Sequence, residues 1–91
     1  MGMQYLYAYR ARIHYDLKQY HEAIDDYTHA IQLDSRYVEA YNNRGAVYHS
    51  LGQYHDAIAD FTDAIRLDPQ YTLAYNYRGS VYEILSIRPI R

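Results

Sequence analysis

The chain contains no cysteine among its 91 residues. A disulfide framework, a thiolate zinc site, an iron–sulfur cluster and a cysteine nucleophile are therefore all excluded. No apolar run approaches the roughly 20 residues that cross a bilayer, and residues 1–4 lack the start of a secretory signal. Because the absence of cysteine fits a reducing compartment, we expect a cytoplasmic protein with no membrane partner.

An excess of charge of either sign is also missing. Nine Lys and Arg residues stand against eleven Asp and Glu residues, which is too balanced for a nucleic-acid partner bound through a basic face. The four glycines form no Gly-rich phosphate loop, so we expect no enzymatic activity and no cofactor. The abundant residue is tyrosine, with fourteen copies, and an apolar fraction of 49% predicts a folded domain.

An internal repeat organises nearly the whole chain. Residues 4–37 align with residues 38–71 without a gap at a shift of 34, and a third copy stops halfway, at 72–88. A period of this length indicates a repeat architecture. We therefore predict one domain, 1–91, of two and a half repeats. The identical pairs in the first two copies are Tyr7/Tyr41, Arg10/Arg44, Leu17/Leu51, Gln19/Gln53, Tyr20/Tyr54, His21/His55, Ala23/Ala57, Ile24/Ile58, Asp26/Asp60, Thr28/Thr62, Ala30/Ala64, Ile31/Ile65, Leu33/Leu67, Asp34/Asp68 and Tyr37/Tyr71.

The apolar residues within each copy recur at helical spacing. Tyr41, Gly45 and Tyr48 fall four and three positions apart on one helix face. Gly52 can end that helix in a left-handed conformation, and Pro69 follows the end of the next. No strand pattern is present, so we predict an all-α fold of antiparallel hairpins that stack side by side. The five predicted helices cover 4–16, 20–33, 38–50, 54–67 and 72–86.

These residues resemble the tetratricopeptide repeat (TPR) family. The residues of the middle copy that carry the pattern are Tyr41, Gly45, Tyr48, Leu51, Gly52, Tyr54, Ala57, Phe61, Ala64, Leu67, Asp68 and Pro69. The resemblance implies a right-handed α-solenoid of helix-turn-helix repeats that serves as a non-enzymatic scaffold for protein–protein interaction. The first copy departs from the pattern at Ala11, His14 and Ser35, and Lys18 replaces the turn glycine. Lys18 must accept a left-handed conformation at about 1 kcal/mol or end the helix differently.

Three arginines recur on the core-facing side of the first helices, at Arg10, Arg44 and Arg78. A charged group near a core needs a partner, and Asp26 and Asp60 recur on the second helices. We predict the structural ion pairs Arg10–Asp26 and Arg44–Asp60, which leave Arg78 without an equivalent acid. A ladder of arginines that binds a ligand is the alternative, and it is disfavoured because the acids repeat with the cations.

A series of histidines and an acid in the first copy is the candidate metal site. His21, Asp25 and His29 are spaced four residues apart on one helix face. No further ligand is evident, and the second copy has Ala59 and Asp63 in place of the last two. We interpret the series as a solvated helix face and predict no metal.

The resemblance places the binding function on a concave groove lined by the first helices. An asparagine amide can donate and accept at once, so inward asparagines can hold the backbone of an extended peptide. The alternative is that Asn42 and Asn76 simply solvate a polar face. The residues predicted to bind a protein or peptide ligand are Arg12, Asn42, Asn43, His49, Asn76 and Tyr77.

Some TPR members clamp the carboxylate of a chaperone tail with a set of Lys, Asn and Arg side chains. Only Asn43 matches that set, which argues against recognition of such a tail. The other four places hold Ala8, Arg12, Leu73 and Tyr77.

The third copy lacks a second helix and therefore exposes one flank of its first helix. Tyr75, Tyr82 and Leu85 lack the cover that the earlier copies have, and the isoleucines near them add apolar surface. As an alternative function we expect self-association through this flank, as a homodimer or with exchanged helices. A third possibility is that the tail, 87–91, folds back over it.

Overall fold

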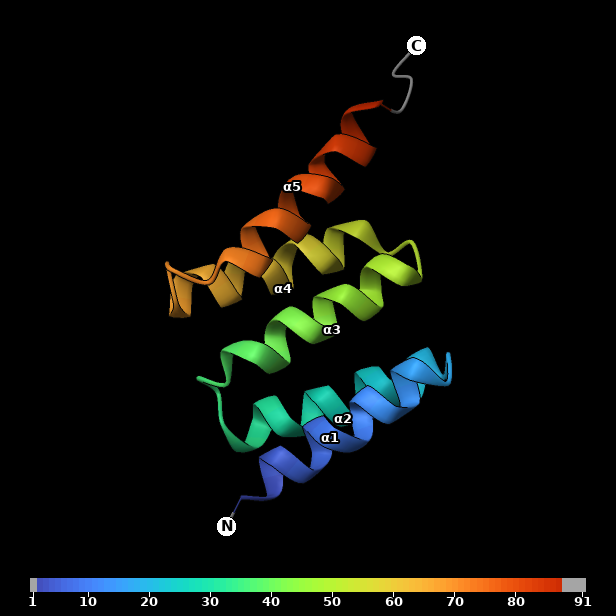
Figure 1. Ribbon diagram of the computed structural model, residues 1–91, viewed down its shortest axis with the longest axis vertical. Helices are drawn as coiled ribbons and strands as arrows, with labels where there is room; N and C mark the ends of the chain where they lie inside the picture. The colour runs from blue at the N-terminus through green and yellow to red at the C-terminus, as the bar shows by residue number, and fades with distance from the viewer. Residues whose placement is uncertain (1, 88–91) are drawn as a thin grey trace.

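The computed structural model describes residues 2–87, which form five α-helices and no strand (Figure 1). The predicted helix bounds differ from the observed ones only at the first and last ends, by one residue each. The expected all-α solenoid is therefore confirmed. The tail from residue 88 onward, with the expected end of the third copy and its fold-back, lies outside the described residues. The helices are α1 (Met3–Asp16), α2 (Tyr20–Leu33), α3 (Val38–Ser50), α4 (Tyr54–Leu67) and α5 (Thr72–Ile87).

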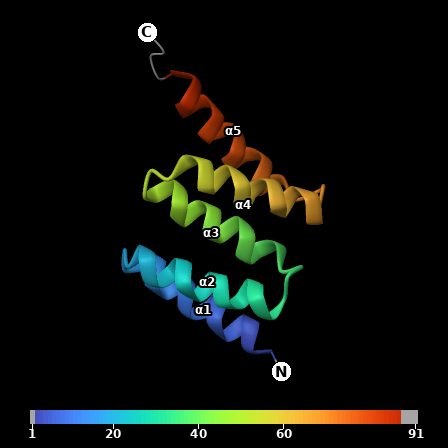
Figure 2. The same ribbon diagram turned by 180° about the vertical axis from the view of Figure 1, so that it is seen from behind.

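The helices form a stack of antiparallel pairs. Helix α1 packs on α2 and α3 packs on α4, and neighbouring pairs meet through α2 with α3 and α4 with α5. Seen from behind, the same order runs from α1 at one end of the stack to α5 at the other (Figure 2). Helix α5 packs on α4 and less extensively on α3, so the described residues cover it on one side only.

Lys18 adopts the left-handed conformation that its repeat position demands. Its φ is 62°, against 76° for Gly52 at the equivalent turn. In both turns the following N–H donates to a carbonyl five residues back, at 2.8 Å after Lys18 and 2.9 Å after Gly52. This bond satisfies one of the last carbonyls of the helix. Of the two outcomes expected for Lys18, the structure has the first.

Small residues lie where the paired helices cross. Ala11 and Ala57 are fully buried, and a Cβ atom on Gly45 would lie only 2.7 Å from the ring of Phe61. The α3–α4 pair can approach this closely only because Gly45 has no side chain. The buried residues form two clusters, one with members from α1, α2 and α3 and one with members from α3, α4 and α5. Helix α3 is therefore covered on both flanks.

The predicted arginine–aspartate pairs join the two helices of each copy. The Nε and Nη2 atoms of Arg10 donate to Asp26 at 2.7 and 2.8 Å. The same atoms of Arg44 donate to Asp60 at 2.8 and 2.7 Å. Both acids are buried, but the Arg10 side chain is 61% exposed against 17% for Arg44. The expectation that Arg10 faces the core is therefore wrong, because no helix of the described residues packs on the outer side of α1.

A threonine of the preceding copy also holds the later arginines. The Nη1 atom of Arg44 donates to Thr28 of α2 at 3.1 Å, and that of Arg78 donates to Thr62 of α4 at 3.2 Å. Arg44 thus connects the first copy to the acid of the second. Asp26 and Asp60 pair with the guanidinium groups of Arg10 and Arg44. The alternative of a ladder of arginines that binds a ligand therefore gains no support.

The two buried aspartates differ in pKa although their partners are the same. Hydrogen bonds from the Arg10 side chain lower the pKa of Asp26. Burial raises the pKa of Asp60, and the hydrogen bonds from Arg44 oppose that effect without overcoming it. Desolvation disfavours the charged carboxylate, so the second pair has the larger cost of burial and depends more on both partners being present.

Replacing Lys18 with glycine should stabilise the protein. A non-glycine residue in the left-handed region costs about 1–2 kcal/mol, part of which is offset by the larger chain entropy of unfolded glycine. We expect Lys18→Gly to raise the free energy of unfolding by about 0.5–1 kcal/mol in urea titrations. Gly52→Ala should lower it by a similar amount. Equal stability of Lys18→Gly and the parent chain would mean that the turn carries no strain.

Breaking the buried pair should cost more than removing it. Asp60→Ala leaves the Arg44 charge in the interior, and such a loss costs roughly 3–5 kcal/mol. Adding Arg44→Leu should restore part of the free energy of unfolding, as measured by urea titration. Asp26→Ala is the matched control and should cost less, because Arg10 reaches water. If Asp60→Ala and the double variant are equally stable, Arg44 solvates itself.

Candidate functional site: a groove across the first helices

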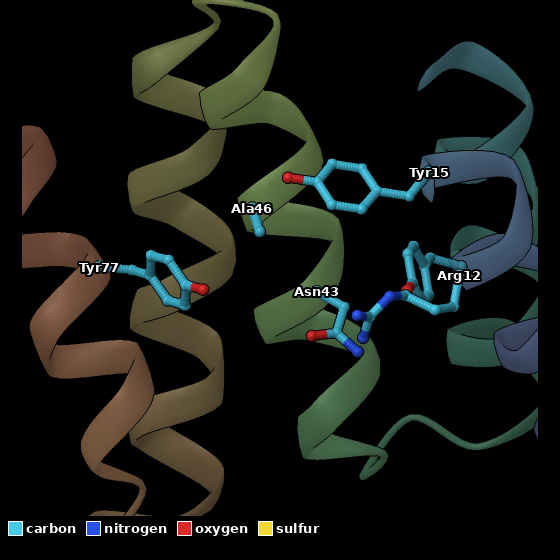
Figure 3. Close-up of a pocket in the computed structure, with 6 residues that line it drawn as sticks. Arg12, Tyr15, Asn43, Ala46 and Tyr77 are labelled. Carbon is cyan, nitrogen blue, oxygen red and sulfur yellow. The ribbon is translucent and has the colours of Figure 1, made fainter. Parts of the chain in front are cut away.

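A cavity of about 120 Å³ opens between α1, α3 and α5 (Figure 3). We call it the groove, and side chains from separate repeat copies converge in it, as in typical binding sites. A larger hollow of about 280 Å³ lies beside α1, but its lining residues all come from that one helix. The residues that line the groove are Arg12, Tyr15, Tyr27, Asn43, Ala46 and Tyr77.

Arg12 of α1 and Asn43 of α3 bring the polar groups of the groove together. In Figure 3 the guanidinium of Arg12 extends from its helix toward the amide of Asn43. The Nε atom of Arg12 donates to Asp16 at 3.1 Å in an exposed contact one turn along α1. This hydrogen bond raises the pKa of Arg12, so the guanidinium stays charged, with the Asp16 carboxylate as its partner beside the groove.

Tyr27 of α2 adds a neutral phenol to the lining of the groove. Its side chain is 1% exposed, and burial raises its pKa to about 12. The nearby Arg12 charge and a hydrogen bond from Asn43 favour the phenolate, but desolvation outweighs both. At neutral pH the groove therefore has the Arg12 cation, the Asn43 amide and the protonated hydroxyl of Tyr27, and the hydroxyls of Tyr15 and Tyr77 belong to its other lining residues.

Two tyrosine rings form the walls on either side of Ala46. Tyr15 shares a hydrogen bond of 3.1 Å with the hydroxyl of Ser50. Tyr77 stacks on Phe61 of α4, with ring centroids 5.4 Å apart and an interplanar angle of 9°. Because the core positions both rings, the small Ala46 leaves a preformed space between them (Figure 3).

Comparison with known proteins identifies the repeat. A family described as TPR repeat matches residues 11–52, and one described as Tetratricopeptide repeat matches residues 38–71. The TPR domain of Arabidopsis OM64 is 30% identical, with 94% of this chain and 71% of that one covered and a TM-score of 0.90. The chain belongs to the tetratricopeptide repeat family. No curated protein matches it.

Two further TPR structures contain bound peptides. The first TPR domain of Spaghetti (RPAP3), bound to the HSP90 peptide SRMEEVD, is 28% identical with a TM-score of 0.87. The second TPR domain of human RPAP3, in complex with the HSP70 peptide SGPTIEEVD, is 32% identical with a TM-score of 0.83. The two matches cover 91% and 87% of this chain, respectively. This chain spans 66% of the length of each of the two RPAP3 chains. The TPR fold is a non-enzymatic interaction fold.

Asn42 does not line the TPR groove, which corrects the prediction for this residue. It is 2% exposed, and its Oδ1 atom is buried without a hydrogen-bond partner in the described part of the chain. Asn76, at the same repeat position in α5, is exposed. The difference lies in the neighbours, because α3 is packed from both sides whereas, among the described helices, α5 has only α4 and α3 beside it.

The structure brings together three of the six predicted groove residues, Arg12, Asn43 and Tyr77. His49 is half-buried, and its ring packs edge-on against Tyr54 of α4 with centroids 5.7 Å apart. It therefore contacts the second helix of its own copy and lies outside the lining of the groove. The exposed Asn76 also lies outside that lining.

Tyr27 was not predicted as a groove residue, because its position belongs to the repeat core. The signal that identifies it is the difference from Phe61 at the same position of the second copy. The aromatic ring is a core requirement in both copies, but a hydroxyl is present only where Arg12 and Asn43 lie nearby. Phe61 instead faces the ring of Tyr77.

The series His21, Asp25 and His29 forms no metal centre in this structure. The Nδ1 atom of His29 lies 2.8 Å from the backbone oxygen of Asp25, and its ring stacks on Tyr7. Within residues 2–87, no three His, Asp or Glu side chains lie close enough to hold one ion. Over the same residues, no helix has the length and apolar character needed to cross a membrane.

Tyr27 should make the protein less stable at high pH. Its folded pKa of about 12 exceeds the unfolded value of about 10, so its contribution is complete below pH 10 and is lost as pH rises toward 12. A difference of two units corresponds to about 2.7 kcal/mol. Urea titrations between pH 9 and 11.5 should show a smaller loss for Tyr27→Phe than for the parent chain. Tyr9→Phe, which removes a hydroxyl from an exposed ring, is the matched control.

Proposed function

We propose that this chain is a non-enzymatic module that binds an extended peptide segment of a partner protein along the groove. The observation that carries the proposal is the convergence of Arg12, Asn43 and Tyr77 from three first helices on one cavity. The Asn43 amide can pair with a peptide backbone in both senses, as donor and acceptor. Bound HSP90 and HSP70 peptides in similar TPR domains support this use of the fold. A cytoplasmic location is part of the proposal, and the absence of cysteine fits it.

The lining of the groove indicates which peptides it would prefer. Arg12 is its one cation, and its Nε atom is bonded to Asp16, so a single acidic group on the peptide would bind through the other N–H groups of the guanidinium. The space over Ala46, between Tyr15 and Tyr77, suits an aromatic side chain, which can pack against the two tyrosine rings. Tails with several acidic groups, such as SRMEEVD, should bind less well.

Self-association through α5 is the alternative that the sequence left open. Tyr75 and Tyr82 are 43% and 49% exposed, and Leu85 is half-buried, so this flank does present apolar surface. However, Arg78 lies near the middle of α5, and a two-fold contact between two such helices would bring the two Arg78 cations together. Like charges at an interface are costly, which disfavours a homodimer built on this flank.

Loss of the Asn43 amide should weaken peptide binding. Heptapeptides selected from a random displayed library on the parent chain should bind Asn43→Ala about 10-fold less tightly, because an unpaired interface amide costs about 1–3 kcal/mol. Isothermal titration calorimetry with the selected peptides gives the affinities. Asn76→Ala, an asparagine outside the groove lining, is the matched control and should bind normally. If the selected peptides bind both variants as tightly as the parent chain, the groove is not the binding site.

A further inference from the structure

Within residues 2–87, the outer flank of α5 repeats the surface of α3 without a helix like the one that covers α3. In α3, Tyr41 is buried and Tyr48 half-buried beneath α4. In α5, Tyr75 and Tyr82 hold the same repeat positions and are 43% and 49% exposed. Figure 1 shows α5 at the end of the stack, with α4 on one side of it.

Helix α4 supplies α3 with two groups from adjacent residues. Asp60 accepts two hydrogen bonds from Arg44, and the ring of Phe61 fills the space beside Gly45, where a Cβ would lie only 2.7 Å away. Ala57 and Ala64, three residues before and three after this pair, are fully buried and allow the close approach.

The first copy presents the same arrangement. In α2, Asp26 accepts two hydrogen bonds from Arg10, and the next residue, Tyr27, is buried in the same cluster as Ala11. Buried alanines again lie three residues before and three after the pair. The covering helix thus has the pattern Ala-x-x-Asp-aromatic-x-x-Ala in both complete copies.

Helix α5 already holds the receiving half of this contact in place. Arg78 donates to Thr62 at 3.2 Å, as Arg44 does to Thr28 at 3.1 Å. Its guanidinium carbon lies 5.8 and 5.7 Å from the ring centroids of Tyr75 and Tyr82. A Cβ on Gly79, the counterpart of Gly45, would meet nothing within 4 Å. The cation is positioned and the space for a ring is open, which lowers the cost of binding.

We propose that the outer flank of α5 binds an amphipathic helix of a partner polypeptide that carries the pattern Ala-x-x-Asp-aromatic-x-x-Ala. The aspartate pairs with Arg78 and the aromatic ring lies against Gly79. The alanines allow the two helices to approach as closely as α3 and α4 do. The requirement for an acid distinguishes this partner from a second α5, which presents a cation at the same place.

A synthetic peptide with the sequence of residues 54–67, blocked at both ends, tests the proposal against the 91-residue chain. Isolated helices of this length are marginal in water, so binding should appear both as heat in calorimetry and as a gain of helical circular dichroism. A peptide with Asp60→Asn should bind about 10-fold or more weakly, because it loses a charge-assisted pair. With Arg78→Gln in the chain, the two peptides should bind alike.

Substitution at Gly79 locates the binding site. Gly79→Leu fills the space for the aromatic ring and should abolish binding, while thermal melting shows that the fold is intact. Ser80→Leu, one residue along the same exposed helix, is the matched control and should bind normally. The chain with Asn43→Ala should also bind this peptide normally, because Asn43 belongs to the groove and not to the flank of α5. The two proposals are therefore tested separately, and the failure of one does not refute the other.

Four results would overturn the proposal. The peptide could fail to bind, or it could bind equally well with aspartate and asparagine, in which case the flank accepts any apolar helix. Binding that survives Gly79→Leu would place the peptide elsewhere. Sedimentation of the chain alone could reveal a dimer that Gly79→Leu dissociates, and a second copy would then be the occupant of this flank.

Discussion

The close approach of the two helices within each copy determines how the copies pack, pair their charges and form the groove. Gly45 leaves room for the ring of Phe61 at a distance that no side chain at that position would permit. The adjacent Asp60 then reaches Arg44, and Arg44 in turn reaches Thr28 of the preceding copy. One crossing point therefore sets the spacing within a pair and also the register between neighbouring pairs. Since each copy contacts only its neighbours, this local geometry propagates along the stack.

The core and the groove share side chains, so the residues that pack the helix crossings also shape the groove. Phe61 fills the space beside Gly45 on one side and carries the stacked ring of Tyr77 on the other. Tyr27 plays the equivalent part in the first copy, where its ring is buried in the core and its hydroxyl belongs to the groove lining. A preformed site of this kind loses little side-chain entropy on binding.

Position in the stack, more than residue identity, decides the electrostatics. The two arginine–aspartate pairs use the same atoms, at 2.7 to 2.8 Å, but hydrogen bonding lowers the pKa of Asp26 whereas burial raises that of Asp60. Arg10 lies on the outer side of the stack and reaches water, while Arg44 lies between two copies. Arg78, in the last helix, keeps the threonine contact and has open space beside Gly79 where the first two copies have an acid and a ring.

The helices and their pairing could be predicted from the amino-acid sequence, because a period of 34 residues and small residues at the crossings constrain local structure directly. The sequence also predicted both ion pairs and, at Lys18, two outcomes between which only the backbone could decide. Half of the groove was predictable, since Arg12, Asn43 and Tyr77 hold inward repeat positions. Only the tertiary structure showed that Asn42 is buried and that Tyr27 reaches the groove. Adjacent helix positions point about 100° apart, and whether a given direction is open depends on helices that are distant in the sequence.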